Sequence, residues 1–68
     1  MDSKKIGERI RKLREDTGQS KRFLARKLGC SYSAVCSWEY GDRIPSDNMK
    51  KKIADHFGCS VSIFFADN

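Results

Sequence analysis

The chain has 68 residues, of which 14 are lysine or arginine and 9 are aspartate or glutamate, giving a formal charge of +5. A chain of this length forms one small domain at most, which excludes a multidomain enzyme. The longest unbroken apolar run covers residues 63–66, whereas a membrane span needs about 20 apolar residues. Charged residues interrupt the first positions, so no signal peptide is visible, and we expect a cytoplasmic protein with no membrane contact.

The cysteines and the single histidine do not form a metal-binding pattern. Cys30, Cys36 and Cys59 are six and 23 residues apart, and His56 is the one histidine. A structural zinc site needs four clustered ligands, and zinc-binding cysteine pairs are closer together than these. We therefore expect no metal, no cofactor and no disulfide, with three reduced thiols in a reducing compartment.

The first two predicted helices end before Gly18 and Gly29. In residues 4–16, apolar residues recur at spacings of four and three, which places on one helical face Ile6, Ile10 and Leu13. The second helix starts at Ser20, a residue that caps helix N-termini well. Its inner face is formed by Leu24, Ala25 and Leu28.

The next two predicted helices start after Ser31 and Ser46 and end at Gly41 and Gly58. Their apolar faces hold Val35 with Trp38, and Met49 with Ile53 and Phe57. The tail 60–65 fits a helix through Val61, Phe64 and Phe65, or a strand through Val61, Ile63 and Phe65. The pattern predicts an all-α fold of four or five short helices, in which the pair joined at Gly29 forms a helix-turn-helix unit.

The third predicted helix has an unusual outer face. In a chain that is 34% charged, this face carries no charged side chain and consists of Tyr32, Ser33, Cys36 and Ser37. Such a face suits a helix that enters the DNA major groove, where hydroxyl groups can donate to or accept from base edges. The other interpretation is an ordinary solvated face.

The stretch from Ser20 to Glu39 resembles the helix-turn-helix of the Cro and phage-repressor type, the Xre family. The residues that match its pattern in order and spacing are Ser20, Leu24, Ala25, Leu28, Gly29, Ser31, Val35, Trp38, Glu39, Gly41 and Pro45. The resemblance continues through 6–14 and 52–60 and covers about 5–65. It implies a compact four- to five-helix, lambda-repressor-like DNA-binding domain over residues 5–65, with the motif at about 21–40.

The resemblance implies a sequence-specific, double-stranded DNA-binding transcriptional regulator, with repression as its expected effect. The helix 31–40 would read the major groove. The residues expected at the DNA are Ser20, Lys21, Arg22, Ser31, Tyr32, Ser33, Ser37 and Arg43. Among them the basic residues are expected at phosphates, while Tyr32, Ser33 and Ser37 face the bases.

Three further features follow from comparing the chain with the family pattern. The family carries a partly buried ion pair at the positions of Arg14 and Glu39. Phe23 stands where a polar residue is usual, and it either covers an apolar gap or faces a partner protein. Lys50 and its neighbour stand where leucine is common, so the fourth helix is expected to have a thinner apolar face. The run 50–52 then either steers DNA through its field or keeps the surface soluble.

The tail predicts a homodimer. Four large apolar residues lie within five positions, namely Val61, Ile63, Phe64 and Phe65. An exposed cluster of this kind marks an interface, although the tail could instead complete a monomer's core.

A second interpretation of the whole chain is a protein-interaction module, such as an antitoxin-like protein or a partner of a protein antirepressor. An enzyme is not expected, because no paired acid motif or glycine-rich phosphate loop is present.

Overall fold

The computed structural model describes residues 2–64, with side chains described through residue 62. The elements in this range are α1 (Ser3–Asp16), α2 (Lys21–Leu28), α3 (Tyr32–Tyr40), α4 (Asp47–Phe57) and a 3-10 turn, η1 (Val61–Phe64). The described range contains no strand, which confirms the all-α prediction. The tail, which the sequence left open between helix and strand, is a 3-10 turn as far as it is described.

Side-chain caps explain where the helices begin. Ser20, Ser31 and Ser46 each accept a hydrogen bond from the backbone N–H three residues later, at 3.0, 3.1 and 3.2 Å. Asp2 caps α1 in a similar way by accepting from the backbone N–H of Lys4 at 2.9 Å. These bonds satisfy N–H groups that have no partner inside the helix, so the short helices are well defined at their starts.

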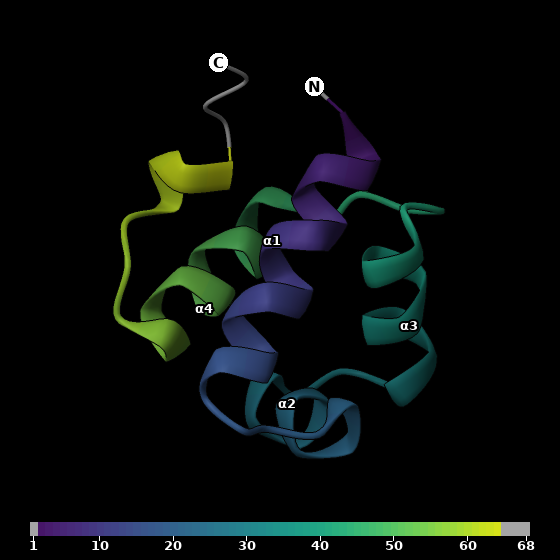
Figure 1. Cartoon of the computed structure of the whole chain (residues 1–68), viewed down its shortest axis with the longest axis vertical. Helices are drawn as coiled ribbons and strands as arrows, with labels where there is room; N and C mark the ends of the chain where they lie inside the picture. Colours follow the sequence, from purple (N-terminus) through teal and green to yellow (C-terminus); the bar gives the residue numbers. More distant parts are fainter. Residues whose placement is uncertain (1, 65–68) are drawn as a thin grey trace.

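The four helices enclose one small apolar core. α1 packs along α3, and α2 packs against both α3 and α4 (Figure 1). The buried core residues are Ile6, Ile10, Leu24, Ala25, Leu28, Val35, Trp38, Ile53 and Ala54. They include most residues of the inner faces that the helical periodicity predicted, whereas Leu13, Met49 and Phe57 of those faces are half-buried and pack against this core. None of the described helices has the length and apolarity needed to cross a membrane.

Lys50 departs from the expectation for the lysine run. Its side chain is only 5% exposed, and Nζ lies 3.8 Å from Asp47 Oδ1, whereas Lys51 and Lys52 are exposed. The long aliphatic stem of a lysine can pack along apolar surface while its ammonium group reaches a polar partner. Lys50 therefore fills part of the inward face of α4 beside Ile53 and Ala54, and only two lysines of the run lie on the surface.

Candidate nucleic-acid interface

α2 and α3 form a tight helix-turn-helix unit. Gly29 ends α2 in the left-handed conformation, with φ of 71°, which glycine adopts without steric cost. The Cys30 N–H donates to the Ala25 carbonyl at 3.0 Å and closes the end of the helix. Ser31 then caps α3. A three-residue connection, residues 29–31, thus fixes the angle between the two helices, and the buried Val35 anchors α3 to the core.

The outer face of α3 carries no carboxylate. Tyr32 is 45% exposed, Ser33 is exposed, and Cys36 and Ser37 are half-buried. Glu39 is the acidic residue of α3, and its side chain is only 2% exposed because it turns toward α1. The face that α3 presents to solvent is therefore polar and free of negative charge, as a helix facing phosphates and base edges must be.

Arg14 neutralises the buried Glu39 carboxylate. Its Nε and Nη2 donate to Glu39 Oε2 and Oε1 at 2.7 and 3.0 Å, which is a bidentate pair. Its Nη1 donates to the Gln19 carbonyl at 2.9 Å. The hydrogen bond with Glu39 raises the pKa of Arg14, so the guanidinium stays charged. The residues expected to pair from the family pattern thus tie α3 to α1 and to the turn before α2.

The basic residues of the first turn of α2 lie against tyrosines of α3. Lys21 Nζ is 5.2 Å from the centroid of the Tyr40 ring, and Arg22 Cζ is 5.0 Å from that of Tyr32. Tyr40 is 68% exposed and was not among the residues expected at the DNA. The sequence feature that could have identified Tyr40 as a site residue is its position at the end of a predicted helix with a polar outer face. The structure therefore groups Lys21, Arg22 and Tyr32 with one residue that sequence reasoning missed.

The remaining predicted contact residues lie at the two ends of the helix pair. The Oγ atoms of Ser20 and Ser31 accept backbone hydrogen bonds as caps, which leaves each hydroxyl hydrogen to donate to an outside acceptor. Arg43 is exposed in the loop after α3. Its backbone N–H donates to the Ser37 carbonyl at 3.4 Å, so the loop folds back on the last turn of α3.

The predicted dimer surface is described only at its start. Val61 is 36% exposed at the beginning of η1. Ile63 and Phe64 belong to η1, but their side chains lie outside the described part of the chain, as does all of Phe65.

Phe23, whose role was left open, is 40% exposed with Lys27 Nζ 5.5 Å from its ring centroid, so it does not fill a gap in the core.

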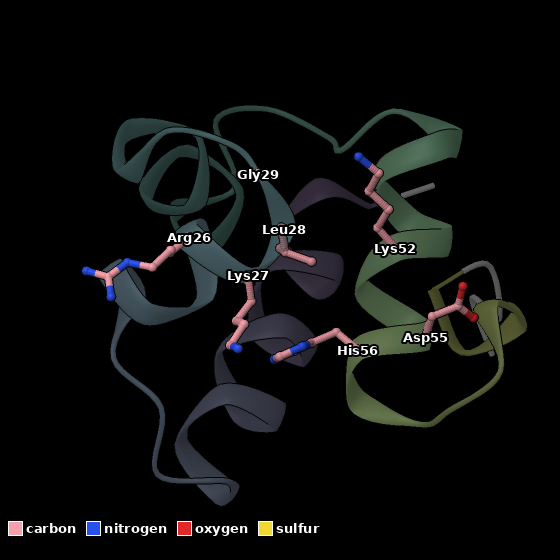
Figure 2. Close-up of a pocket in the computed structure, with 7 residues that line it drawn as sticks. All are labelled: Arg26, Lys27, Leu28, Gly29, Lys52, Asp55 and His56. Atoms are coloured by element: carbon pink, nitrogen blue, oxygen red, sulfur yellow. The ribbon is translucent and has the colours of Figure 1, made fainter.

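An open depression of about 600 Å³ lies between the C-terminal end of α2 and α4 (Figure 2). Its basic rim includes Arg26 and Lys52. His56 also lines it, but its Nε2 is hydrogen-bonded to Gln19 Oε1 at 2.8 Å, which joins α4 to the turn before α2. In Figure 2 the Arg26 and Asp55 side chains point outward on opposite sides, so the lining does not converge on one point.

The three cysteines are unpaired, and each is half-buried. Burial raises the pKa of the Cys30 thiol, so the reactive thiolate is disfavoured there. No group of metal-binding side chains is found among residues 2–64.

Comparison with known proteins agrees with this geometry. The model of the helix-turn-helix family matches residues 10–64. The chain belongs to the helix-turn-helix family. It is 36% identical over 63 residues to the HTH-type transcriptional regulator DicA of Escherichia coli K12, covering 91% of this chain and 47% of DicA. The chain thus spans about half the length of that curated relative.

Two solved structures have the same fold as this helix-turn-helix protein. The restriction-modification controller protein C.AhdI from Aeromonas hydrophila superposes with a TM-score of 0.86 at 33% identity, covering 94% of this chain and 97% of that one. The clp gene regulator ClgR from C. glutamicum gives a TM-score of 0.83 at 23% identity, covering 96% and 84%. These relatives confirm the resemblance to the Cro and phage-repressor type and its lambda-repressor-like fold.

Proposed function

We propose that the chain is a sequence-specific, double-stranded DNA-binding transcriptional regulator that acts as a repressor in the cytoplasm. The DNA-binding domain covers residues 5–65, with the motif at about 21–40. The observation that carries the proposal is the outer face of α3. It is polar, its one acidic residue, Glu39, is buried in an ion pair with Arg14, and basic residues of α2 lie at both of its ends. The relatives named above are transcriptional or gene regulators and a controller protein, which supports this function.

In this proposal α3 enters the major groove and the first turn of α2 lies at the DNA backbone. Tyr32, Ser33 and Ser37 then face base edges and supply sequence preference. Lys21, Arg22 and Arg43 neutralise phosphates and set the register of the domain on the duplex. The N-terminus of α2 adds free backbone N–H groups, which favour a phosphate at the same place.

We predict that Lys21 and Ser33 contribute to two different properties of binding. Lys21→Ala should weaken binding to operator and random duplex alike and should make the salt dependence shallower by about 0.9 per subunit. Ser33→Ala should leave the salt slope unchanged and reduce the preference for the operator by roughly 1–3 kcal/mol, if the hydroxyl makes a good base contact. Fluorescence anisotropy with the two duplexes at several salt concentrations measures both.

The operator for this comparison comes from footprinting on the DNA that flanks the gene of the protein. Lys51→Ala is the matched control, because Lys51 is an exposed lysine on α4. The control should change the salt slope by less than Lys21→Ala does and the operator preference by less than Ser33→Ala does. A change of sequence preference alone in Lys21→Ala would remove this lysine from the phosphate contacts. Equal losses on both duplexes in Ser33→Ala would remove the serine from the base contacts.

We further propose that the DNA-bound unit is a homodimer joined through the tail that begins at Val61. A domain of this size contacts few base pairs, and two copies on half-sites about 34 Å apart supply the missing specificity. Val61 is 36% exposed at the end of the described chain, next to three further large apolar residues in the sequence. An apolar cluster at a partly exposed position is typical of an interface.

Sedimentation tests the dimer. The wild type is expected to sediment as a dimer at micromolar concentration, and Val61→Asp as a folded monomer, because a carboxylate in an apolar interface is costly to bury. Ser60→Asp adds the same charge at an exposed neighbour and serves as the control. A wild type that remains monomeric at high micromolar concentration, and occupies a single half-site on DNA, would contradict the dimer.

A further inference from the structure

Each end of α3 carries a tyrosine against which a basic side chain of α2 is placed. Tyr32 is the first residue of α3 and Tyr40 is the last. Arg22 Cζ lies 5.0 Å from the Tyr32 ring centroid, and Lys21 Nζ lies 5.2 Å from that of Tyr40. Both distances are within the roughly 6 Å over which a cation is attracted to the face of an aromatic ring.

This arrangement separates two basic residues that are adjacent in sequence. Lys21 and Arg22 are the first two residues of α2, yet their charged groups lie against two different rings, those of the last and the first residue of α3. Each of the two charged groups is therefore directed by the ring that it meets.

The rings also restrict side chains that would otherwise be mobile. A lysine or arginine on a helix surface samples many rotamers, and this freedom is lost when it binds a phosphate. A side chain already held near its bound position loses less freedom on association. Tyr40 is 68% exposed and belongs to no core contact, so stabilising the fold does not account for its position.

We propose that Tyr40 and Tyr32 are positioning residues, whose rings hold Lys21 and Arg22 beside the last and the first residue of α3 for phosphates of the DNA backbone. This inference rests on the proposed DNA binding. Tyr40 itself contacts no base in this arrangement and acts through Lys21. Removing the Tyr40 ring leaves the charge of Lys21 in place but frees the lysine side chain to move. Duplex binding should therefore weaken about two- to fivefold, the factor that corresponds to an exposed cation–ring contact.

The test compares Tyr40→Leu with Tyr40→Phe, each in the wild type and in the Lys21→Ala background. Tyr40→Leu should weaken binding of a random duplex about two- to fivefold, and Tyr40→Phe should bind like the wild type because the ring remains. In the Lys21→Ala background, Tyr40→Leu should have no further effect. In the free protein, the Lys21 side-chain protons should show an upfield ring-current shift by NMR that Tyr40→Phe keeps and Tyr40→Leu loses.

Phe23→Leu is the matched control. Lys27 lies over the Phe23 ring at 5.5 Å, so this change removes a similar cation–ring contact from the middle of α2, away from the ends of α3. It should not alter duplex binding. Thermal unfolding should be unchanged in Tyr40→Leu, which separates positioning from folding.

Three results would overturn the positioning role while leaving the proposed function intact. These are a Tyr40→Leu variant that binds as the wild type does, a Tyr40→Phe variant that loses as much binding as Tyr40→Leu, and additive losses in the double variant. Additive losses would mean that Tyr40 contacts DNA directly. A wild-type protein that binds no duplex at any salt concentration would instead overturn the proposed function itself, and the DNA role of the rings with it.

Discussion

Replacing Arg14 by alanine is expected to lower the free energy of unfolding by about 3–5 kcal/mol, the usual cost of removing one partner of a buried ion pair. Glu39 would keep a carboxylate whose side chain is only 2% exposed, after losing both hydrogen bonds from the guanidinium. The Gln19 carbonyl would lose its donor as well. A domain of 68 residues has a total stability of roughly 3–10 kcal/mol, so this variant should be near its unfolding limit at room temperature.

Removing the other partner of the ion pair, Glu39, is expected to lower the free energy of unfolding by less. In Glu39→Ala the guanidinium left behind is 12% exposed and keeps the Gln19 carbonyl, and its long stem lets it reach water. Urea unfolding followed by circular dichroism measures both variants. Arg11→Ala is the control, since Arg11 is an exposed arginine on the same helix and should change stability by less than about 0.5 kcal/mol. An Arg14→Ala protein as stable as this control would show that the pair does not hold α3 on α1.

Gly7→Ala is expected to destabilise the protein although alanine is the better helix former. A Cβ atom at position 7 would clash with the Trp38 carbonyl oxygen and would lie 3.0 Å from that of Glu39. Both contacts are with the backbone of α3, so no side-chain rotation relieves them, and α1 must move away from α3. Overpacking of this kind costs about 1–3 kcal/mol and sometimes more, which exceeds the gain of about 1 kcal/mol or less in helix propensity.

This substitution should also weaken DNA binding, because the α1–α3 contact fixes the position of α3. Glu8→Ala, at the next and exposed position of α1, gains helix propensity without the clash and serves as the control. The midpoint temperature of thermal unfolding should fall in Gly7→Ala and should rise or stay unchanged in Glu8→Ala. Equal or raised stability in Gly7→Ala would mean that α1 and α3 are farther apart than the structure places them.

Local signals were enough to predict the helices and much of the core. Ser20, Ser31 and Ser46 marked the helix starts because a serine side chain can satisfy a free N–H group, and the structure shows all three in that role. The spacing of Ile6 and Ile10 identified the buried face of α1 because a helix repeats every 3.6 residues. Such features depend on neighbours within one or two turns, which a sequence displays directly.

Features that depend on distant segments were missed. Lys50 looked like a surface charge, because residue type does not reveal where an aliphatic stem packs. The need for glycine at position 7 has no local signal, because it comes from a backbone 31 residues further along the chain, at Trp38. Tyr40 was missed because its contact with Lys21 crosses from one helix to another.

The most direct test of the central claim is the salt dependence of binding between the wild-type protein and a random-sequence duplex. If Lys21, Arg22 and Arg43 each neutralise one phosphate, log K should fall linearly with log[salt] with a slope of about −2.7 per subunit, and about twice that for a dimer. Anisotropy titration at four or more salt concentrations gives this slope. A slope in that range supports an interface built on α2 and α3, whereas absence of duplex binding even at low salt would contradict it.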